Sequence, residues 1–282
     1  MQHREHIAGI IFWGATVLSA GVTLAVLVFM VILSLPIIKN DMILEVLMGP
    51  WSPDYGLFGI LPMIVGTLCI ALLSLVFSFP VSLGCSIFIE IIRPGKPGRF
   101  LKKFVRLMTA VPTVIYGFVG VFLLVPHVRG FVSHGSGMCI LSASLMLGLV
   151  ISPTMILFFS QSFARVPKTY LNAVDALGGT QFQKFIYLLF PQAWPGILTG
   201  IILAFGRAMG DTLIALMISG NSVMLPTSPL DSARTLTAHI AMIIAADFGS
   251  IEFKTIFLCG GILYLLTSFG ILLARFSAGK QN

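Results

Sequence analysis

Charged residues are scarce in this chain. They make up 10% of the 282 residues, against 57% hydrophobic residues, and mean hydropathy is +1.02. A soluble globule of this composition would expose far too much apolar surface, so the soluble classes are excluded. Strict alternation of apolar and polar residues is also missing, which argues against an outer-membrane barrel. The sequence therefore predicts an all-α, polytopic transmembrane helical bundle.

Cysteine is rare and scattered, and its spacing is not that of a metal site. The histidines likewise lack the spacing of a zinc motif. No nucleophile is paired with a base, and no Gly-rich phosphate loop is present. We therefore expect no metal, no cofactor and no covalent chemistry on this chain. The residues considered are Cys69, Cys85, Cys139, Cys259, His127, His134 and His239.

Long hydrophobic runs are what the chain has instead. Each is long enough to cross a hydrocarbon core of roughly 30 Å. The second is long for one straight crossing, and Pro80 with Gly84 predicts a bend that neighbouring helices can tolerate. The six predicted spans are 7–35, 59–90, 104–126, 138–164, 196–219 and 251–275.

The basic residues favour one orientation in the bilayer. Most of the 17 Lys and Arg residues lie at the chain ends and in the segments 93–106 and 165–184. The opposite side holds only Lys39, Arg129, Arg234 and Lys254. The positive-inside rule then places both termini in the cytoplasm. Membrane orientation explains the net charge of +7 better than a nucleic-acid partner does.

Two opposite charges interrupt the apolar run from Gly196 to Gly220. They are Arg207 and Asp211, in the string GRAMGDT. An ionisable group at membrane depth costs about 3 kcal/mol and marks a transport path, relay or ligand site. On one helix the two side chains would share a face and partly neutralise each other. Two interpretations remain open: an ion pair that fixes packing, or an Arg207 that meets an anion.

Three hydroxyl side chains are further candidates for the substrate path, namely Thr113, Tyr116 and Thr212. Each could donate to an anion, although hydroxyls in membrane helices also bond helix to helix. Gly206 and Gly210, four residues apart, favour close helix approach beside the charges.

The segment 165–195 carries a second signal. Apolar residues at helical spacing predict a short helix over 169–177, which Gly178 and Gly179 end. A second short helix, 181–189, is predicted to run up to Pro191. Such a unit outside the bilayer suits docking into a groove on another protein. The alternative is a loop that folds back on its own bundle.

The segment 221–250, on the opposite side, is long enough for a helix over 233–246 against the outer surface. Arg234, His239 and Asp247 in it either contact an external partner or form a solvated face.

The segment 165–195 resembles the cytoplasmic "EAA" loop of ABC-importer permeases, through the pattern A-x4-G-x12-P. That resemblance implies a coupling helix seated in an ATPase subunit. Asn172 stands where the family usually has Glu, and Val174 where it usually has Ala. The residues assigned to this loop are Asn172, Ala173, Val174, Asp175, Gly178, Gly179, Leu188 and Pro191.

Two more specific strings are similar to phosphate ABC transporter permease subunits. They are PGILTGIILAFGRAMGDTLIALMISGN and AVPTVIYGFVGVFLLVP. The match resembles the C-type (PstC-like) member of the paired permeases, with Asp211 in place of the usual Glu.

The resemblance implies a type I ABC importer permease fold in a bacterial cytoplasmic (inner) membrane. It also implies a second, different permease, an ATPase dimer that hydrolyses ATP on separate chains, and a periplasmic or extracellular binding protein that delivers inorganic phosphate. The chain itself would then be no enzyme.

We divide the chain into an N-terminal span with its external loop, 1–58, and a permease domain, 59–282. Other tetrahedral oxyanions, namely sulfate, molybdate and tungstate, remain alternatives to phosphate. A secondary anion transporter is a further alternative, which would need its own coupling-ion site. A membrane-embedded enzyme comes last, for want of a catalytic constellation.

Overall fold

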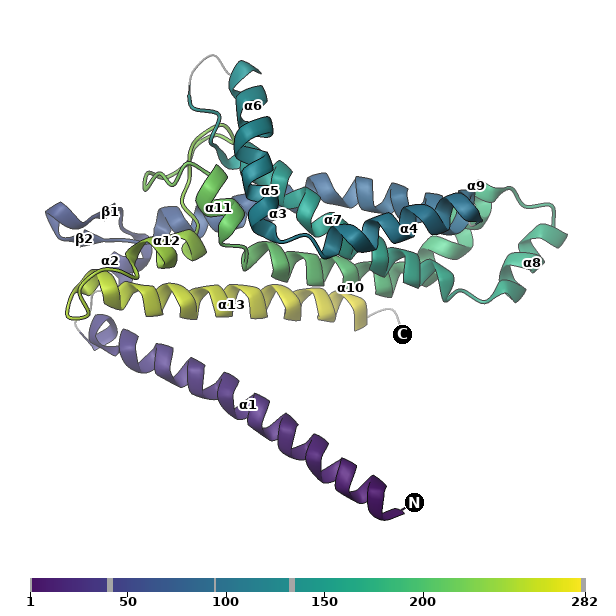
Figure 1. Cartoon of the computed structure of the whole chain (residues 1–282), viewed down its shortest axis with the longest axis horizontal. Coiled ribbons are helices and arrows are strands. Elements are labelled where there is room, and N and C mark those ends of the chain that lie inside the picture. The colour runs from purple at the N-terminus through teal and green to yellow at the C-terminus, as the bar shows by residue number, and fades with distance from the viewer. Residues whose placement is uncertain (1, 40–42, 94, 132–134, 280–282) are drawn as a thin grey trace.

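The computed structural model describes residues 2–39, 43–93, 95–131 and 135–279, and His134 lies outside them. Almost all of its regular structure is helical (Figure 1). Its α-helices are α1 (Gln2–Lys39), α2 (Ile43–Met48), α3 (Leu61–Ile87), α4 (Lys96–Thr109), α5 (Thr113–Val119), α6 (Val125–Phe131), α7 (Ile140–Ala164), α8 (Lys168–Ala176), α9 (Gln181–Gln183), α10 (Phe190–Met209), α11 (Leu213–Ile218), α12 (Leu236–Ile243) and α13 (Ile251–Gly279).

Shorter elements complete this list. β1 (Trp51–Ser52) and β2 (Leu57–Phe58) form a small antiparallel hairpin, with Trp51 opposite Phe58. The 3-10 turn η1 (Pro53–Tyr55) joins them. Three π-helical turns, η2 (Phe88–Ile92), η3 (Gly120–Leu124) and η4 (Lys184–Leu189), adjoin α3, α5 and α10.

Six helical stretches of the described chain are long and apolar enough to cross a membrane. They are Gly9–Ile37, Leu61–Ile92, Thr113–Phe131, Ile140–Ala164, Gln181–Met209 and Ile251–Leu272. The predicted all-α, six-span architecture is confirmed. The predicted bounds are close for the first, second, fourth and sixth spans, whereas those of the third and fifth are wrong.

The third span begins later than the predicted 104–126. Residues 96–109 form a separate helix, α4, whose basic and apolar residues lie on different faces. Pro112 separates it from α5, because proline lacks a backbone donor and adopts the extended conformation seen here, with ψ 139°. The span therefore starts at Thr113.

The fifth span begins earlier and ends earlier than the predicted 196–219. The predicted short helix over 181–189 continues through η4 into α10 as one stretch. The π-helical turn directly before Pro191 accommodates the missing donor of that proline, so the helix does not end there. It ends at Met209 instead, and Gly210 is its C-cap residue.

The core lies where α3 and α10 pack on α7, the most buried span. Serines line the contact between α3 and α7. The Oγ atoms of Ser78 and Ser152 lie 2.9 Å apart, and the Ser82 hydroxyl donates to the Ser152 carbonyl at 3.3 Å. Interhelical hydroxyl bonds of this kind hold membrane helices together where lipid offers no hydrophobic driving force.

Small residues bring α10 against α7. They recur every fourth position along one face of α10, and Gly200 and Ala204 are buried. The full set is Gly196, Gly200, Ala204 and Ala208. The close approach predicted at Gly206 and Gly210 does not occur within the described chain, because a Cβ at Gly206 would meet nothing within 4 Å and one at Gly210 would meet only the Gly206 carbonyl.

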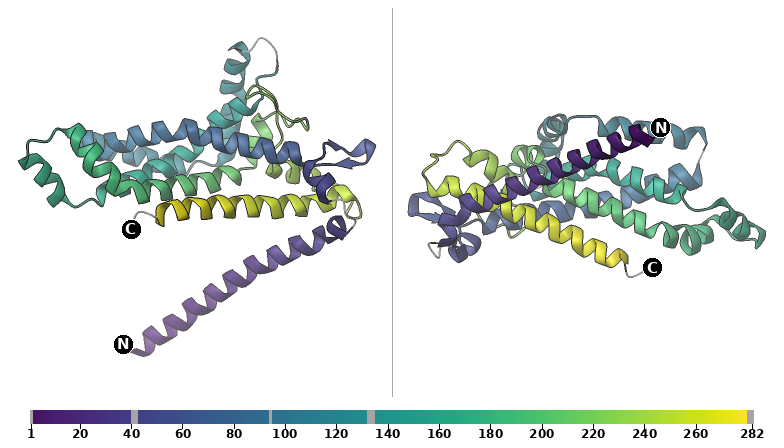
Figure 2. Two further views of the ribbon diagram at one scale, coloured as in Figure 1. Left: turned by 180° about the vertical axis from the view of Figure 1, so that it is seen from behind. Right: turned by 90° about the horizontal axis from the view of Figure 1, so that it is seen from below.

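The bundle has two distinct ends (Figure 2). The hairpin end carries β1, β2, α2 and α12, and the α8 end carries α8 and α9. Helix α1 packs on α13 near the hairpin end, where Phe29 meets Phe257 edge-on, and then diverges from the other helices. Many of its large apolar side chains are exposed, among them Trp13 and Leu18, whereas Ile37 at the hairpin end is buried. Both α1 and α13 have their free ends on the α8 side.

Helix α12 is shorter and much more buried than the helix predicted over 233–246. Leu236, Ala238 and His239 are fully buried. The Leu236 backbone N–H donates to Thr67 Oγ1 of α3 at 2.9 Å. The prediction of a solvated outer helix face is therefore wrong for α12. Nearby, Gly220 has φ +84°, and a Cβ there would lie 2.7 Å from the Met138 carbonyl oxygen, so only glycine fits this turn.

Candidate functional site

The site is built around a break in the fifth span. Helix α10 ends at Met209, and α11 begins at Leu213. Arg207 lies two residues before the end of α10 and contacts Thr154 of α7. The position of Thr154 along α7 therefore indicates how deep in the membrane the break lies. At 1.5 Å per residue, Thr154 lies about 15 Å from one end of α7 and about 21 Å from the other. The break is therefore close to mid-membrane, where irregular backbone is tolerated only inside protein or along a cavity.

Arg207 is half-buried, and its Nη1 donates to Thr154 Oγ1 at 3.2 Å. Within the described part of the chain, no carboxylate oxygen lies within 4 Å of its guanidinium. The predicted sharing of one helical face with Asp211 does not occur, because the helix ends between the two residues. Arg207 thus keeps donors for a further acceptor.

Asp211 has a structural role in the break itself. Its Oδ1 accepts a hydrogen bond from the Ile214 backbone N–H at 2.9 Å, which satisfies one free donor at the start of α11. Its carbonyl accepts from Thr237 Oγ1 of α12, also at 2.9 Å. The break between α10 and α11 is therefore stabilised in part by Thr237, a residue far from Asp211 in the sequence.

The three hydroxyl candidates occupy different places. Thr212 directly precedes α11, and Thr113 is the first residue of α5; both are half-buried. The Tyr116 hydroxyl donates to the Met108 carbonyl at 3.2 Å and so ties α5 to α4. No hydrogen bond among the described residues joins any of the three to Arg207.

Helix α5 nevertheless packs tightly against α11. A Cβ added at Gly117 would lie 2.5 Å from Met217 Sδ, and one at Gly120 would overlap Ile218. The glycines of the VPTVIYGFVG string thus bring the third span beside the broken fifth span.

The predicted docking segment protrudes at the α8 end (Figure 1). Helix α8 (Lys168–Ala176) lies within a residue of its predicted bounds, and Gly178 with φ +74° follows it as the predicted stop. Its members Asn172, Ala173 and Asp175 are exposed. Of the others, Val174 and Leu188 are half-buried, Gly178 and Pro191 are exposed, and Gly179 contacts Val174.

Sequence reasoning missed two residues that the structure brings into these regions. Thr154 is the partner of Arg207, and its sequence signal is a hydroxyl next to Pro153 in the middle of an apolar span. Lys184 is buried and forms an ion pair with Asp175. Its signal is a pair of opposite charges on either side of Gly178 and Gly179.

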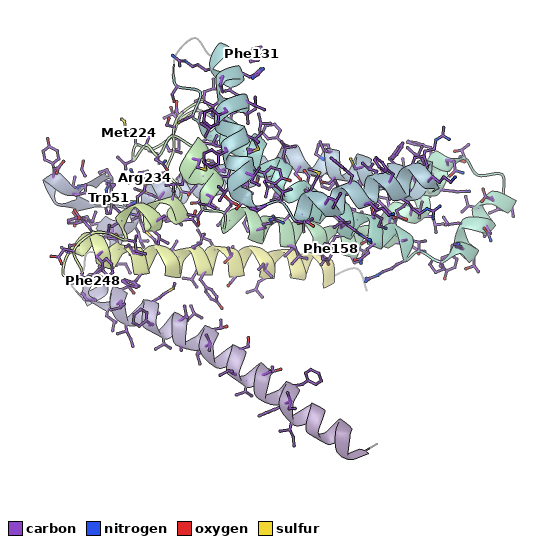
Figure 3. The ribbon with its side chains drawn as sticks, viewed as in Figure 1. Trp51, Phe131, Phe158, Met224, Arg234 and Phe248 are labelled. Carbon is purple, nitrogen blue, oxygen red and sulfur yellow. The ribbon has the colours of Figure 1, made fainter. Side chains whose placement is uncertain are left out.

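A buried aromatic and cationic cluster lies at the hairpin end (Figure 3). The ring of His239 meets Trp51 edge-on, with centroids 4.3 Å apart. Neither ring nitrogen of His239 has a hydrogen-bond partner among the described residues. Burial, reinforced by the charge of Arg234, lowers the pKa of His239 to about 4. Arg234 donates from Nε to the Asn221 carbonyl at 3.1 Å, and burial lowers its pKa as well.

This histidine predicts a loss of stability in mild acid. Its folded pKa, about 4, lies below the unfolded value of about 6.5, so the unfolded chain binds more protons between those values. Stability is full above about pH 6.5 and falls by up to about 3 kcal/mol as the pH drops towards 4. The measurement is the melting temperature of the detergent-solubilised chain at about pH 7.5 and about pH 5.

His239→Leu is the matched variant, since leucine cannot titrate and leaves no buried nitrogen unpaired. We expect it to melt at least as high as the unmodified chain near neutral pH, with a smaller loss in acid. Asp231, whose pKa is lowered by hydrogen bonds from Thr227 and Ser228, titrates below this window. An equal acid sensitivity of both chains would contradict the assignment to His239.

Known proteins match this chain over most of its length. The family model described as "Binding-protein-dependent transport system inner membrane component" matches residues 82–276. The probable ABC transporter permease protein YqgH of Bacillus subtilis is 32% identical over 82% of this chain and 76% of its own. The phosphate transport system permease protein PstC of Xylella fastidiosa is 28% identical over 80% of this chain and 75% of its own.

The fold is also found among solved structures. A bacterial ABC transporter involved in alginate import matches with a TM-score of 0.61 over 94% of this chain and 96% of that chain, at 14% identity. Its likeness concerns the fold alone. The family match over residues 82–276 establishes that the chain belongs to the inner-membrane components of binding-protein-dependent transport systems.

Proposed function

We propose that this chain is a permease subunit of an ATP-driven importer and that its cargo is inorganic phosphate. The relatives named as phosphate permeases support this cargo, since several match at 26 to 28% identity over most of the chain. This support favours phosphate over the other tetrahedral oxyanions.

The observation that carries the proposal is Arg207. A guanidinium at mid-membrane depth, hydrogen-bonded to a threonine and with no carboxylate within 4 Å among the described residues, is costly unless it serves an anion. Its planar fork can hold two oxygens of an oxyanion at once, as a lysine cannot. Asp211, held at the start of α11, adds negative charge beside this path and opposes tight retention of the cargo.

The proposed path is completed by Thr212, which lies in the break, and by Thr113 and Tyr116 of α5, which packs beside α11. In this proposal the second permease supplies the opposite wall of the path. We infer a heterodimer from the C-type resemblance, with residues 59–282 as the permease domain and 1–58 as an added span.

The α8 end faces the cytoplasm in our proposal, as do both termini. The basic residues of α4 and of the 165–184 segment lie towards this end, in keeping with the positive-inside rule. Helix α8 then docks in a groove of the ATPase, with Leu177, Phe182 and Tyr187 as exposed apolar side chains near it.

The test is copurification of the chain with the second permease, the ATPase and the binding protein, followed by ATP hydrolysis in proteoliposomes. We expect the binding protein to stimulate hydrolysis when it is supplied with phosphate. It should not do so when it is supplied with sulfate or molybdate instead. Anion uptake by the chain without any ATPase would instead favour a secondary transporter.

A further inference from the structure

Lys184 is a charged residue in a buried position. It begins η4, at the start of the fifth span, and is only 6% exposed. Its ammonium group pairs with the carboxylate of Asp175 on α8. The two residues flank the Gly178–Gly179 turn, so the ion pair closes a short loop between the protruding helix and the span.

The two partners differ in burial. The Asp175 side chain is 55% exposed, whereas that of Lys184 is 8% exposed. A buried ammonium group demands a counter-charge, while an exposed carboxylate does not. Glu90 lines the same region but is already paired with Lys102 at 2.7 Å. Asp175 is therefore the counter-charge that Lys184 depends on.

Few other contacts hold α8. None of its residues is buried, and the chain that follows it turns through Gly178 in the left-handed region. Beneath α8 lies a cavity of about 440 Å³, lined by Leu171, Asn172 and Asp175 from α8 and by Lys184 from the span. Helix α8 thus has room to shift against the bundle unless the ion pair restrains it.

The other side of the ion pair is a long, continuous helix. From Lys184 the chain runs through η4 and α10 without interruption to Met209, and it carries Arg207 near its far end. Lys184 and Arg207 are about 35 Å apart along this helix, at 1.5 Å per residue. One unbroken helical stretch therefore connects the site of the ion pair with the mid-membrane break.

We propose that the Asp175–Lys184 ion pair positions α8 on the fifth span and transmits movement of α8 to Arg207. This inference rests on the proposed function, in which α8 is the segment that meets the ATPase. Asp175 and Lys184 are positioning residues here, since neither touches the cargo.

The first test concerns position alone and uses the full chain without partners. Spin labels at Ala176 and Gln192, both exposed, report the distance between α8 and the span. We expect Lys184→Met to broaden the distance distribution, because methionine fills the buried site but cannot bind Asp175. Lys103→Met is the matched control, as Lys103 is an exposed lysine of α4 that forms no ion pair in the described chain. An unchanged distribution in Lys184→Met would overturn the proposal.

The second test concerns transmission and uses the complete transporter in proteoliposomes. The readout is the amount of phosphate imported per ATP hydrolysed. This ratio does not change when a variant merely lowers the amount of folded transporter. We expect Lys184→Met to lower this ratio by about threefold. The exchange of both charges, Asp175→Lys with Lys184→Asp, should restore part of it. A ratio equal to that of the Lys103→Met control would refute transmission through this ion pair.

The two tests separate this inference from the proposed function. If the unmodified chain failed to bind any ATPase, the proposed function would be wrong. The label distances would still decide whether the ion pair positions α8.

Discussion

Phosphate uptake should fall about a hundredfold when Arg207 is replaced by glutamine. Two charge-assisted hydrogen bonds to the passing oxyanion are worth about 3 kcal/mol together, and about 1.4 kcal/mol corresponds to a factor of ten. Arg207→Lys keeps the charge but loses the planar fork, so we expect an intermediate loss of about tenfold. The measurement is uptake of labelled phosphate by cells that depend on this transporter.

The control is Arg106→Gln, which removes an exposed arginine from α4 without approaching the break in the fifth span. Membrane abundance of each variant is measured beside uptake, since a buried-site change can reduce folding. Undiminished uptake by Arg207→Gln at normal abundance would remove this residue from the transport path and leave the proposal without its main support.

The spans were predictable because hydropathy is a local property. Helix α7, for example, is mostly apolar and carries no charged residue, and its bounds differ from the prediction by only a few residues. Arg207 could be identified as a functional candidate for the same reason, because a charge within a long apolar run is visible in the sequence itself.

The break after Met209 could not be predicted in the same way. Apart from Arg207 and Asp211 the chain is mostly apolar on both sides of it, and Gly210 is compatible with either a continuous or a broken helix. The break is held by Asp211, which caps α11, and by Thr237, which contacts the Asp211 carbonyl from a helix far along the chain. The sequence alone does not indicate that Thr237 and Asp211 come into contact.

The cytoplasmic segment shows the same contrast. Its first helix was predictable, because Gly178 and Gly179 end it locally. Its second helix was wrongly separated from the span, because Pro191 suggests a stop while the π-helical turn before it allows the helix to continue. The burial of Lys184 depends on how that continuous helix packs, so its ion pair with Asp175 was not predictable either.

Replacement of Gly200 by leucine should destabilise the chain by forcing α10 away from α7. Even a methyl group at this position would lie 3.0 Å from Phe158 Cβ and from the ring of Phe159, both on α7. A leucine must therefore push α10 away from α7, and overpacking of this kind costs about 1 to 3 kcal/mol or more. We expect the melting temperature in detergent to fall by about 10 °C.

Gly206→Leu is the matched control for this change, since it lies on the same helix and a Cβ there meets nothing within 4 Å in the described chain. Both substitutions raise helix propensity equally, so a difference between them reports packing against α7 alone. The Gly200→Leu variant should also lose the hydrogen bond between Arg207 and Thr154, because the two residues come from the helices that it separates. Equal melting temperatures for the two variants would mean that α10 does not approach α7 through Gly200, and the depth assigned to Arg207 would then lose its structural basis.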